Sequence, residues 1–539
     1  MRYLASKGLE RSAGLALACG LAAAIAACTT PEAEPSGAAS PTGSGGAPAA
    51  AAPVEPYGAK DACASCHLRE TPGLVAHWQG STHAVMDVMC LDCHEAEAGD
   101  LDAFEHEGAL ISTIVTPKDC AECHDEEAAE FQASHHSKGG NILHSLDNLL
   151  AETVEGYRGT WKIRNPHDPK QVLEVNGLAF ANSGCHQCHG SQIALMTTDG
   201  RSLTPWSLQQ PPEGGKAVVT FDAAAVAGAE IARDEQGRPV YDTRTWPNTG
   251  IGRMNLDGSR GSCTACHSRH DFSARRARQP ENCGKCHLGP DHPQKEIYEE
   301  SKHGIAYRDL IGDMNLDGEE WVLGADYNAA PTCATCHMSA TKDLKITHDP
   351  RTRISWNNRP AISVRLDTDD EGHVVPPEQA TSTWQDKRAT MKQVCTNCHT
   401  SRYVDGFYAQ YDDFVTLYNE KYAKPGAKLM EALHAYGLIS KANFDDEIEW
   451  TWFYLWHHEG RRGRHGASMM APDYAHWHGT YEVAERWYVE FLPQAKEIID
   501  HAKEDPAKRA NAEKADKILQ WILSKPWNAH SARGLREDR

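Results

Sequence analysis

The sequence is poor in basic residues, in aromatic residues and in long apolar runs. Its 539 residues hold 54 Lys and Arg against 75 Asp and Glu, a formal net charge of −21, which argues against nucleic acid as a partner and favours a small or cationic one. Aromatic residues make up 8% and hydrophobic residues 40% of the chain, too little for a bundle of membrane spans. Residues 402–525 lack cysteine, yet the whole chain has 18 cysteines and 29 histidines. These two counts need a chemical explanation.

The first residues are typical of an export signal. Arg2, Lys7 and Arg11 precede an apolar run over 12–27 that is too short for a comfortable transmembrane helix. The run ends in Ile25-Ala26-Ala27-Cys28, which resembles a bacterial lipobox, so Cys28 is expected to become the lipidated first residue of the mature chain. Ordinary cleavage at a small-residue site is the alternative. We therefore expect a periplasmic protein that meets a membrane only through this N-terminal lipid anchor.

Sixteen of the cysteines form eight Cys-x-x-Cys-His units. Composition alone predicts roughly 0.03 such units by chance, so the repetition is not accidental. Two thiols three residues apart can reach the two vinyl groups on one edge of a haem, and the histidine that follows can bind its iron. The units are Cys63-Cys66-His67, Cys90-Cys93-His94, Cys120-Cys123-His124, Cys185-Cys188-His189, Cys263-Cys266-His267, Cys283-Cys286-His287, Cys333-Cys336-His337 and Cys395-Cys398-His399.

Other chemistries of paired cysteines fit this pattern less well. Zinc sites would pool two pairs but need no histidine after every second cysteine, and redox dithiols occur singly. Export agrees with c-type haem, which is attached outside the cytoplasm, where unprotected thiols would oxidise. The sequence therefore predicts eight covalent haem c groups.

Eight haems need up to sixteen axial ligands, and the motif histidines supply eight of them. Four further histidines occur in a Ser-x-His pattern close to a motif, which predicts second ligands: His83, His136, His270 and His303. Additional candidates are His77, His144 and His348, and His135 competes with His136. For any one of these residues the alternative is a surface or hydrogen-bonded histidine.

Between and after the motifs the sequence predicts a mostly α fold, a multihaem cytochrome c with haem-wrapping loops and short helices followed by a C-terminal helical bundle. Residues 156–240, rich in Pro, Gly and β-formers, predict loops and a short hairpin. The similar stretches 251–258 and 311–318 predict Asx/Gly turns, with a calcium loop as the alternative for the second. Apolar residues at helical spacing predict five helices, over 405–420, 429–439, 444–458, 481–503 and 507–523.

These features predict five segments. Residues 1–28 form the lipoprotein signal peptide, and residues 29–56, rich in Ala, Pro and Gly, form a disordered linker with a reach of about 30 Å. An octahaem cytochrome c domain follows over 57–400, then a helical domain over 401–525 and a tail over 526–539.

The arrangement resembles the octahaem hydroxylamine oxidoreductase family from about Asp61 onward. The resemblance lies in the eight motifs, the cysteine-free C-terminus and four local stretches: 185–190, 263–272, 289–292, and 457–462 leading to 472–479. In that family the fourth haem is catalytic with an open distal position, and the other seven are bis-histidine electron carriers. The resemblance therefore implies that His189 is the proximal ligand of the reactive iron.

The resemblance also implies catalytic side chains. An Asp-His pair over the open face falls by motif on Asp291 and His292, where proton acceptors are needed as N–H and O–H bonds break. The alternative is that Asp291 caps a helix over 293–301 and His292 binds another haem. Oxidising members carry a tyrosine from a neighbouring subunit that is bonded to the catalytic haem. The best match is Tyr474, with Tyr481 in reserve, and a packed aromatic residue is the alternative. A tyrosine supplied in this way implies a homotrimer.

The expected activity is oxidation of hydroxylamine to nitric oxide or nitrite, with electrons passed along the haems to a soluble cytochrome c or a quinone-linked acceptor. Hydrazine oxidation, or reduction of nitrite or hydroxylamine, is the alternative within the family. A conduit that only transfers electrons is the alternative from another class of protein. An acidic surface suits a basic cytochrome partner in either case.

Overall fold

The computed structural model describes residues 61–144, 160–209, 218–248, 250–370 and 372–528. The chain divides into two compact units, Met1–Pro56 and Tyr57–Arg539, and every described residue belongs to the second. The predicted signal peptide with Cys28, the predicted linker and residues 529–539 of the predicted tail lie outside the described residues. Within the described ranges, no helix combines the length and the apolar character needed to cross a membrane.

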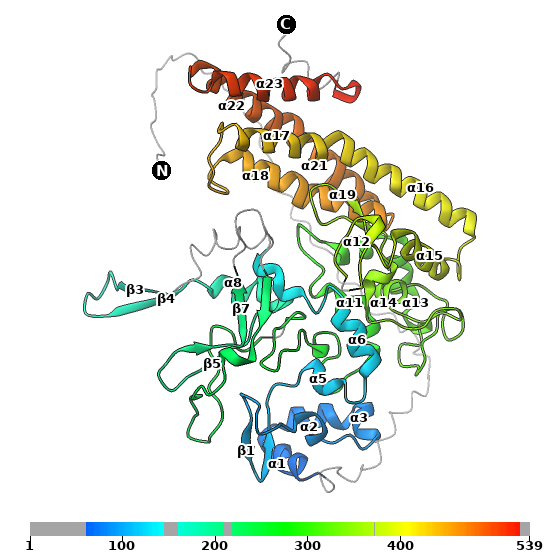
Figure 1. Cartoon of the computed structure of the whole chain (residues 1–539). Helices are drawn as coiled ribbons and strands as arrows, with labels where there is room; N and C mark the ends of the chain where they lie inside the picture. The colour runs from blue at the N-terminus through cyan, green and yellow to red at the C-terminus, as the bar shows by residue number, and fades with distance from the viewer. Residues whose placement is uncertain (1–60, 145–159, 210–217, 249, 371, 529–539) are drawn as a thin grey trace, which may run out of the picture. The chain divides into compact units, whose positions relative to one another are not determined.

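Short helices carry most of the motifs (Figure 1). The first group is α1 (Ala62–Glu70), α2 (Pro72–Gln79), α3 (Thr82–Val85), α4 (Leu91–His94), α5 (Pro117–Cys120), α6 (Asp125–Ala133), η2 (Gly139–His144), α8 (Ala179–Ser183) and α9 (Cys185–His189). The second group is η3 (Ala223–Ala225), η4 (Cys263–Ala265), α10 (Ala274–Arg278), α11 (Pro280–Gly284), α12 (Gln294–Glu300), α13 (Lys302–Leu310), η5 (Ile311–Asp313), α14 (Cys333–His337), η6 (Pro350–Arg353), η7 (Pro377–Gln379) and α15 (Trp384–Cys395). Helices this short are marginal in isolation, so they depend on caps and tertiary contacts.

The described strands pair as five separate antiparallel hairpins. They are β1 (Phe104–His106) with β2 (Ala109–Ile111), β3 (Thr160–Arg164) with β4 (Val172–Asn176), β5 (Leu195–Met196) with β6 (Ser202–Leu203), β7 (Trp206–Gln209) with β8 (Val218–Phe221), and β9 (Trp356–Asn357) with β10 (Val364–Arg365). In the longest hairpin, Trp161 pairs with Val175 and Ile163 with Leu173. Three hairpins lie within 156–240, where the sequence predicts loops and one short hairpin.

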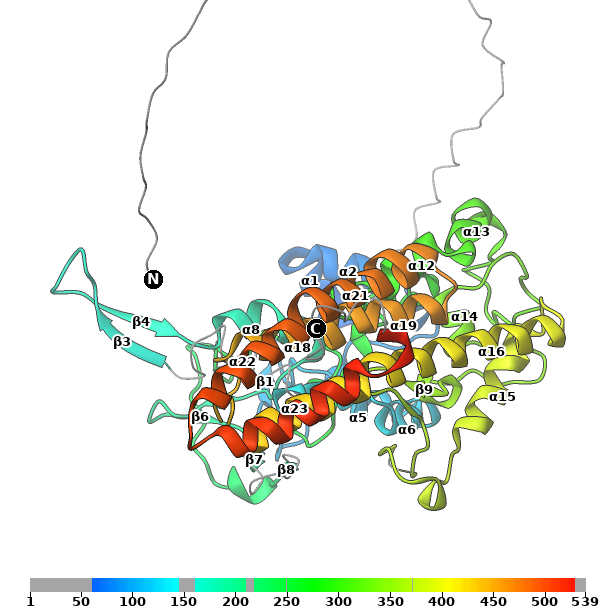
Figure 2. The ribbon, with the colours of Figure 1, turned by 90° about the horizontal axis from the view of Figure 1, so that it is seen from above.

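Helical segments make up most of the chain after the last motif, and the longer ones run side by side in both views (Figures 1 and 2). They are α16 (Ser401–Tyr418), η8 (Asn419–Ala423), α17 (Lys424–Ala435), α18 (Glu447–Phe453), η9 (Tyr454–Glu459), α19 (Gly460–Ser468), α20 (Pro472–Ala475), η10 (His476–Tyr481), α21 (Glu482–Glu485), η11 (Arg486–Phe491), α22 (Leu492–Glu504), α23 (Arg509–Leu523) and η12 (Pro526–Asn528).

Four of these segments, η8 to η11, are π-helical turns inside longer helical rods. Two of them directly precede a helix with a proline in its first turn, Pro425 in α17 and Pro493 in α22. A proline ring clashes with the carbonyl one turn before it, and a wider turn makes room for it. The sequence predicts helices over 444–458 and 481–503; the structure is helical over 447–458 and 481–503, with a π turn inside each range.

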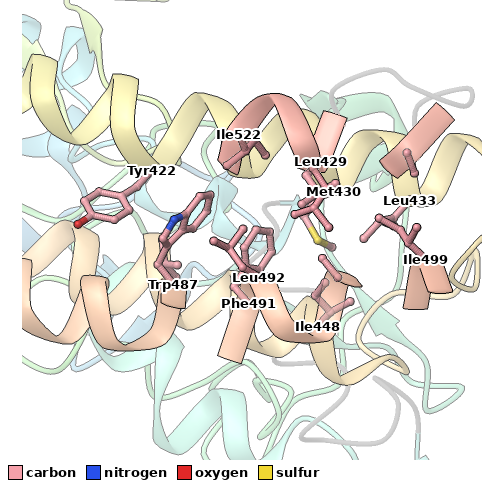
Figure 3. Packing of buried hydrophobic residues seen from close by; sticks show 14 of the residues in the cluster. Tyr422, Leu429, Met430, Leu433, Ile448, Trp487, Phe491, Leu492, Ile499 and Ile522 are labelled. Carbon is pink, nitrogen blue, oxygen red and sulfur yellow. The ribbon is translucent and has the colours of Figure 1, made fainter. Parts of the chain in front are cut away.

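The largest hydrophobic core holds these helices together (Figure 3). Leu429 and Leu433 of α17 pack with Trp487 and Phe491 of η11 and with Leu492 at the start of α22. All five side chains are buried, and a spacing of four residues keeps Leu429 with Leu433, and Trp487 with Phe491, on one face of its helix. The predicted mostly α fold with a C-terminal bundle is therefore confirmed.

This core predicts a stability difference between two neighbouring positions. Leu492→Ala should destabilise the protein by about 2–5 kcal/mol, because it removes a fully buried side chain and leaves a cavity. Val489→Ala, at a position 66% exposed, should change stability by less than about 0.5 kcal/mol. Thermal unfolding followed by circular dichroism compares the two variants, and equal midpoints would contradict this assignment of the core.

Candidate functional site

Each Cys-x-x-Cys-His unit lies on or next to a short helical turn. In five units the histidine N–H donates to the carbonyl of the first cysteine at 2.9–3.1 Å, namely His94, His124, His267, His287 and His399. Residues at i, i+3 and i+4 share a helix face, so the turn brings two thiols and one imidazole to the same side. Among the described residues the motif cysteines form no disulfides with one another, as thioether bonding requires.

Six motif histidines face a second histidine at nearly constant distance. The ring centroids are 6.1–6.4 Å apart in every pair: His67 with His106, His94 with His270, His124 with His83, His267 with His348, His287 with His136, and His399 with His303. A metal–imidazole bond is about 2 Å long, so two rings on opposite sides of one metal have centres about 6 Å apart. The side chains present therefore fit a haem with two imidazole ligands at each of these six motifs.

Five of the predicted second ligands belong to these pairs: His83, His136, His270, His303 and His348. His135 instead accepts a hydrogen bond of 3.4 Å from Arg359 Nη2, so the structure favours His136 over His135. His77 is exposed on α2. The side chain of His144 lies outside the described residues. The ligand roles of His77 and His144 stay predictions.

His106 is a facing histidine that the sequence analysis missed. It ends β1 and lies 6.2 Å from His67, but no serine stands two residues before it, so the Ser-x-His pattern does not find it. A different signal could have found it, because His106 is the one histidine between the second and third motifs.

The Ser-x-His pattern has a structural cause. Ser81, Ser134 and Ser301 are buried and donate to the carbonyl of an aromatic residue three positions earlier at 2.6–2.7 Å. The same hydroxyls accept from the backbone N–H of a following residue at 3.1–3.2 Å. The aromatic residues are Trp78, Phe131 and Tyr298, all in the core. Each serine thereby fixes a turn that directs the histidine two positions later away from the core.

The motifs follow one another in space as a chain with one branch. Thiols of consecutive members lie within electrostatic range of each other in six pairs: Cys63 and Cys90, Cys93 and Cys120, Cys120 and Cys263, Cys266 and Cys283, Cys283 and Cys333, and Cys336 and Cys395. The fourth motif joins this chain at the sixth, where Cys188 lies within hydrogen-bond range of Cys286 and 3.9 Å from the carbonyl of Lys285. The spatial order is thus 1-2-3-5-6-7-8, with 4 beside 6.

Asp291 and His292 lie next to the sixth motif. His292 Nδ1 and Asp291 Oδ1 are 2.6 Å apart, and Arg461 Nη1 is 3.5 Å from Asp291 Oδ2. Burial would raise the pKa of Asp291, but the hydrogen bond with His292 and the charges of His457 and Arg461 lower it to about 2. The carboxylate therefore stays ionised at neutral pH. The alternative role as a helix cap is wrong, because Pro293 occupies the N-cap of α12 and makes no side-chain cap bond.

His292 and His136 are alternative candidates for the coordination position that faces His287. Its ring lies 6.3 Å from that of His287, almost the same distance as the ring of His136. Only one of the two imidazoles can occupy the far side of one metal. The catalytic role of Asp291 and His292 stays a prediction.

A segment around η9 supplies further polar groups to this region. His457 and Glu459 are almost fully buried there, and Glu459 is ion-paired with Arg486 at 2.9 Å. Burial lowers the pKa of His458 to about 4 and of His465 to about 3, helped by nearby cationic groups. Both imidazoles are therefore neutral at pH 7 and can accept hydrogen bonds.

Tyr474 and Tyr481 lie on adjoining turns of the C-terminal helices. The backbone N–H of Tyr474 donates to Glu300 Oε1 at 3.3 Å, and its ring centre lies 5.4 Å from that of His478. Tyr481 is 53% exposed and contacts His476 and Trp477. The predicted bond joins a tyrosine to the haem of a neighbouring subunit, so both roles stay predictions.

Motifs suited to thioether attachment of haem, together with the facing histidines, define a multihaem c-type cytochrome. Residues 176–445, half of the chain, match the family described as seven times multi-haem cytochrome CxxCH, and the chain belongs to this family. Covalent haem c is therefore its cofactor. The predicted resemblance is confirmed at the level of the multihaem cytochrome c family, and the fold is that of a solved multihaem protein.

One curated protein and two solved structures are similar to this chain. The chain is 28% identical over 370 residues, 66% of its length, to a probable nitrite reductase-hydroxylamine oxidoreductase fusion protein of Kuenenia stuttgartiensis, and it spans only 36% of that relative. The fold resembles a solved hypothetical multiheme protein with a TM-score of 0.62 at 22% identity, over 80% of this chain and 95% of that one. A reducing HAO-like protein complex of Kuenenia stuttgartiensis has a TM-score of 0.48 at 19% identity, over 82% of this chain and 85% of that one.

The histidine pairs predict the consequence of removing His106. His106→Ala should convert one low-spin haem into a high-spin haem, because the metal next to His67 loses its facing imidazole. Low-temperature electron paramagnetic resonance with spin quantification measures the change. His501→Ala, at an exposed position of α22, is the control and should leave the spectrum unchanged. An unaltered low-spin count in the first variant would rule out His106 as a ligand.

Proposed function

We propose that the chain is an octahaem c-type cytochrome that oxidises hydroxylamine to nitric oxide or nitrite. The arrangement that carries this proposal is the hydrogen-bonded pair Asp291 and His292 beside Arg461. This pair lies next to the sixth motif, which the fourth motif adjoins. When bound at Cys185, Cys188 and His189, haem c supplies the metal that removes electrons from the substrate and passes them to neighbouring haems.

His292, supported by Asp291, accepts protons released in this reaction. Oxidation of hydroxylamine to nitric oxide releases three protons with three electrons, so a proton acceptor must stand by the reacting bonds. The ionised Asp291 holds His292 Nδ1–H by the 2.6 Å hydrogen bond, which leaves Nε2 as the acceptor and stabilises the imidazolium that forms. Arg461, close to the second oxygen of Asp291, keeps that carboxylate ionised and oriented.

The branch in the order of motifs suits an enzyme that exports electrons. Haems held at the fourth and sixth motifs would be neighbours, because Cys188 lies within hydrogen-bond range of Cys286. A haem at the fourth motif would then pass electrons to the one at the sixth, and from there toward the first or the eighth. The net charge of −21 favours delivery to a basic cytochrome c, steered by charge and weakened by salt. A quinone-linked acceptor is the other outlet.

The proposed setting follows from the N-terminus and from Tyr474. The lipobox-like sequence before Cys28 favours a periplasmic protein anchored to a bacterial membrane by lipid, and a tyrosine supplied by a neighbouring subunit implies a homotrimer. A tyrosine bonded to haem alters the potential of the macrocycle in favour of electron removal from the substrate.

Two other functions have specific support. Reduction of nitrite or hydroxylamine by the same centre is favoured by the name of the Kuenenia relative, a probable nitrite reductase-hydroxylamine oxidoreductase fusion protein. A purely conducting role is favoured by the six facing histidine pairs. Steady-state assays with hydroxylamine, hydrazine and nitrite, each with a suitable artificial electron acceptor or donor, distinguish the three functions.

The proton-accepting role predicts the effect of neutralising Asp291. Asp291→Asn should lower kcat for hydroxylamine oxidation by about 100-fold or more, because His292 loses the carboxylate that orients it and stabilises its imidazolium, and a correctly positioned general base contributes about that factor. The matched control is Asp199→Asn, which removes the carboxylate of the exposed ion pair with Arg201 and should keep wild-type kcat. Equal activity in both variants, with full haem content, would refute the role of Asp291.

The tyrosine assignment predicts a spectroscopic difference. The reduced wild-type protein should show an absorption band that ordinary haem c lacks, since a bond from Tyr474 saturates one position of the macrocycle. Tyr474→Phe should abolish this band, and Tyr481→Phe should retain it. Loss of the band only in the second variant would move the role to Tyr481, and its absence from the wild type would count against the oxidative direction.

A further inference from the structure

The hairpin of β1 and β2 supports two successive motifs. His106, at the end of β1, faces His67 of the first motif with the ring centroids 6.2 Å apart. Ser112, directly after β2, holds His94 of the second motif at two points. Its backbone N–H donates to the His94 carbonyl at 3.0 Å, and its carbonyl accepts from His94 Nδ1 at 2.8 Å. With Nδ1 occupied in this way, Nε2 is the ring atom left to bind a metal.

Asp102, at the base of this hairpin, is a buried carboxylate joined to Ser112. The side chain is 7% exposed, and its Oδ2 accepts from the Ser112 hydroxyl at 2.6 Å and from the Tyr241 hydroxyl at 3.1 Å. Ser112 is therefore the single residue that links Asp102 to His94. Because the hydrogen bonds around a ligand set its orientation and its basicity, Asp102 is placed to act on the second motif.

The groups around Asp102 leave its charge uncompensated. The titratable side chains that act on it are Tyr241 and Asp100, and Arg253 acts on Tyr241 from the far side of the phenol. Burial and the charge of Asp102 raise the pKa of Tyr241, so the phenol keeps its proton and donates it. The side chains that bond Asp102 are thus neutral hydroxyls, and no ion pair with a cation holds it among the described residues.

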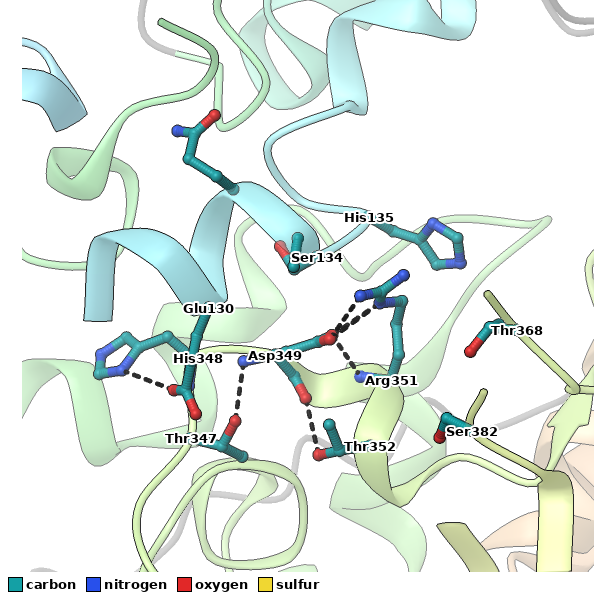
Figure 4. Close-up of polar contacts among 12 residues, drawn as sticks. Glu130, Ser134, His135, Thr347, His348, Asp349, Arg351, Thr352, Thr368 and Ser382 are labelled. Atoms are coloured by element: carbon teal, nitrogen blue, oxygen red, sulfur yellow. Dashed lines mark hydrogen bonds and ion pairs between the residues drawn. The ribbon is translucent and has the colours of Figure 1, made fainter. Parts of the chain in front are cut away.

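A carboxylate beside another ligand shows the contrast. Asp349, next to the facing histidine His348, binds the guanidinium of Arg351 through both oxygens at 2.6–3.0 Å (Figure 4). A buried carboxylate without such a cation is costly to ionise. Burial accordingly raises the pKa of Asp102 above its usual value, although the bonds from the two hydroxyls offset part of this effect.

We propose that Asp102 positions His94 through Ser112 and is the proton acceptor that accompanies reduction at the second motif. Asp102 takes up one proton from solvent when one electron reaches the metal held by His94, and it releases this proton when the electron moves on. The proton thus balances the charge that the electron adds next to an uncompensated carboxylate. This role requires haem at the second motif and does not depend on the substrate of the enzyme.

The test measures the pH dependence of the haem potentials in the Asp102→Asn holoprotein, by redox titration with low-temperature electron paramagnetic resonance. At pH 8 the wild-type carboxylate is ionised and favours the ferric state. The ferric-to-ferrous ratio of one haem at fixed potential should therefore fall about tenfold in the variant, which equals about 59 mV for a one-electron couple. As the pH falls through the pKa of Asp102, the wild-type carboxylate gains its proton and this difference should disappear.

Asp367→Asn is the matched control. Asp367 is 5% exposed and its Oδ1 accepts from the Trp384 backbone N–H at 2.8 Å, away from any motif histidine in sequence. Its neutralisation should leave the potential of this haem unchanged at both ends of the pH range. Equal potentials in Asp102→Asn and the wild type at pH 8, with eight haems bound in each, would overturn the proposal and leave Asp102 with a structural role alone.

Tyr241→Phe keeps the carboxylate and decides the question if Asp102→Asn fails to fold. This variant removes one hydrogen bond to the ionised form of Asp102, which raises the pKa of that carboxyl group further. The pH at which the potential changes should therefore move upward, while the size of the change is kept. A pH profile identical to that of the wild type would show that the proton binds elsewhere.

Discussion

A metal with two imidazole ligands keeps the ring centres about 6 Å apart, and much of this structure serves to hold that spacing. Polypeptide cannot fill the gap between the rings, because the gap belongs to the cofactor. The facing histidines must therefore be held in place by contacts on the side away from the cofactor. At three of the second ligands, a buried serine two residues before the histidine donates a hydrogen bond to the carbonyl of a core aromatic residue. Proximal ligands can instead be held through the ring: His94 Nδ1 donates to the Ser112 carbonyl at 2.8 Å.

The C-terminal helices have a single continuous core from α17 to α23. The motif region instead has several smaller hydrophobic clusters among its short helices and hairpins. The η9 and α19 segments of the C-terminal helices also extend to the Asp291 pair through Arg461. A well-packed helical element therefore positions a charge beside loops that would be poorly fixed without it.

Buried cations are the second recurring feature of the structure. Arg253, Arg353 and Arg464 are almost fully buried, and their hydrogen bonds go to carbonyl, amide and hydroxyl oxygens.

The sequence by itself determined the cofactor class, the motif ligands and most second ligands, because thioether attachment and axial ligation depend on spacings of three or four residues that are readable along the chain. It also indicated the long C-terminal helices through their periodicity, although not the π turns before Pro425 and Pro493. Only the tertiary structure decided which histidine faces which, that His106 is one of them, and that the fourth motif adjoins the sixth. These features join residues distant in the chain, and packing, which has no local signature, sets them.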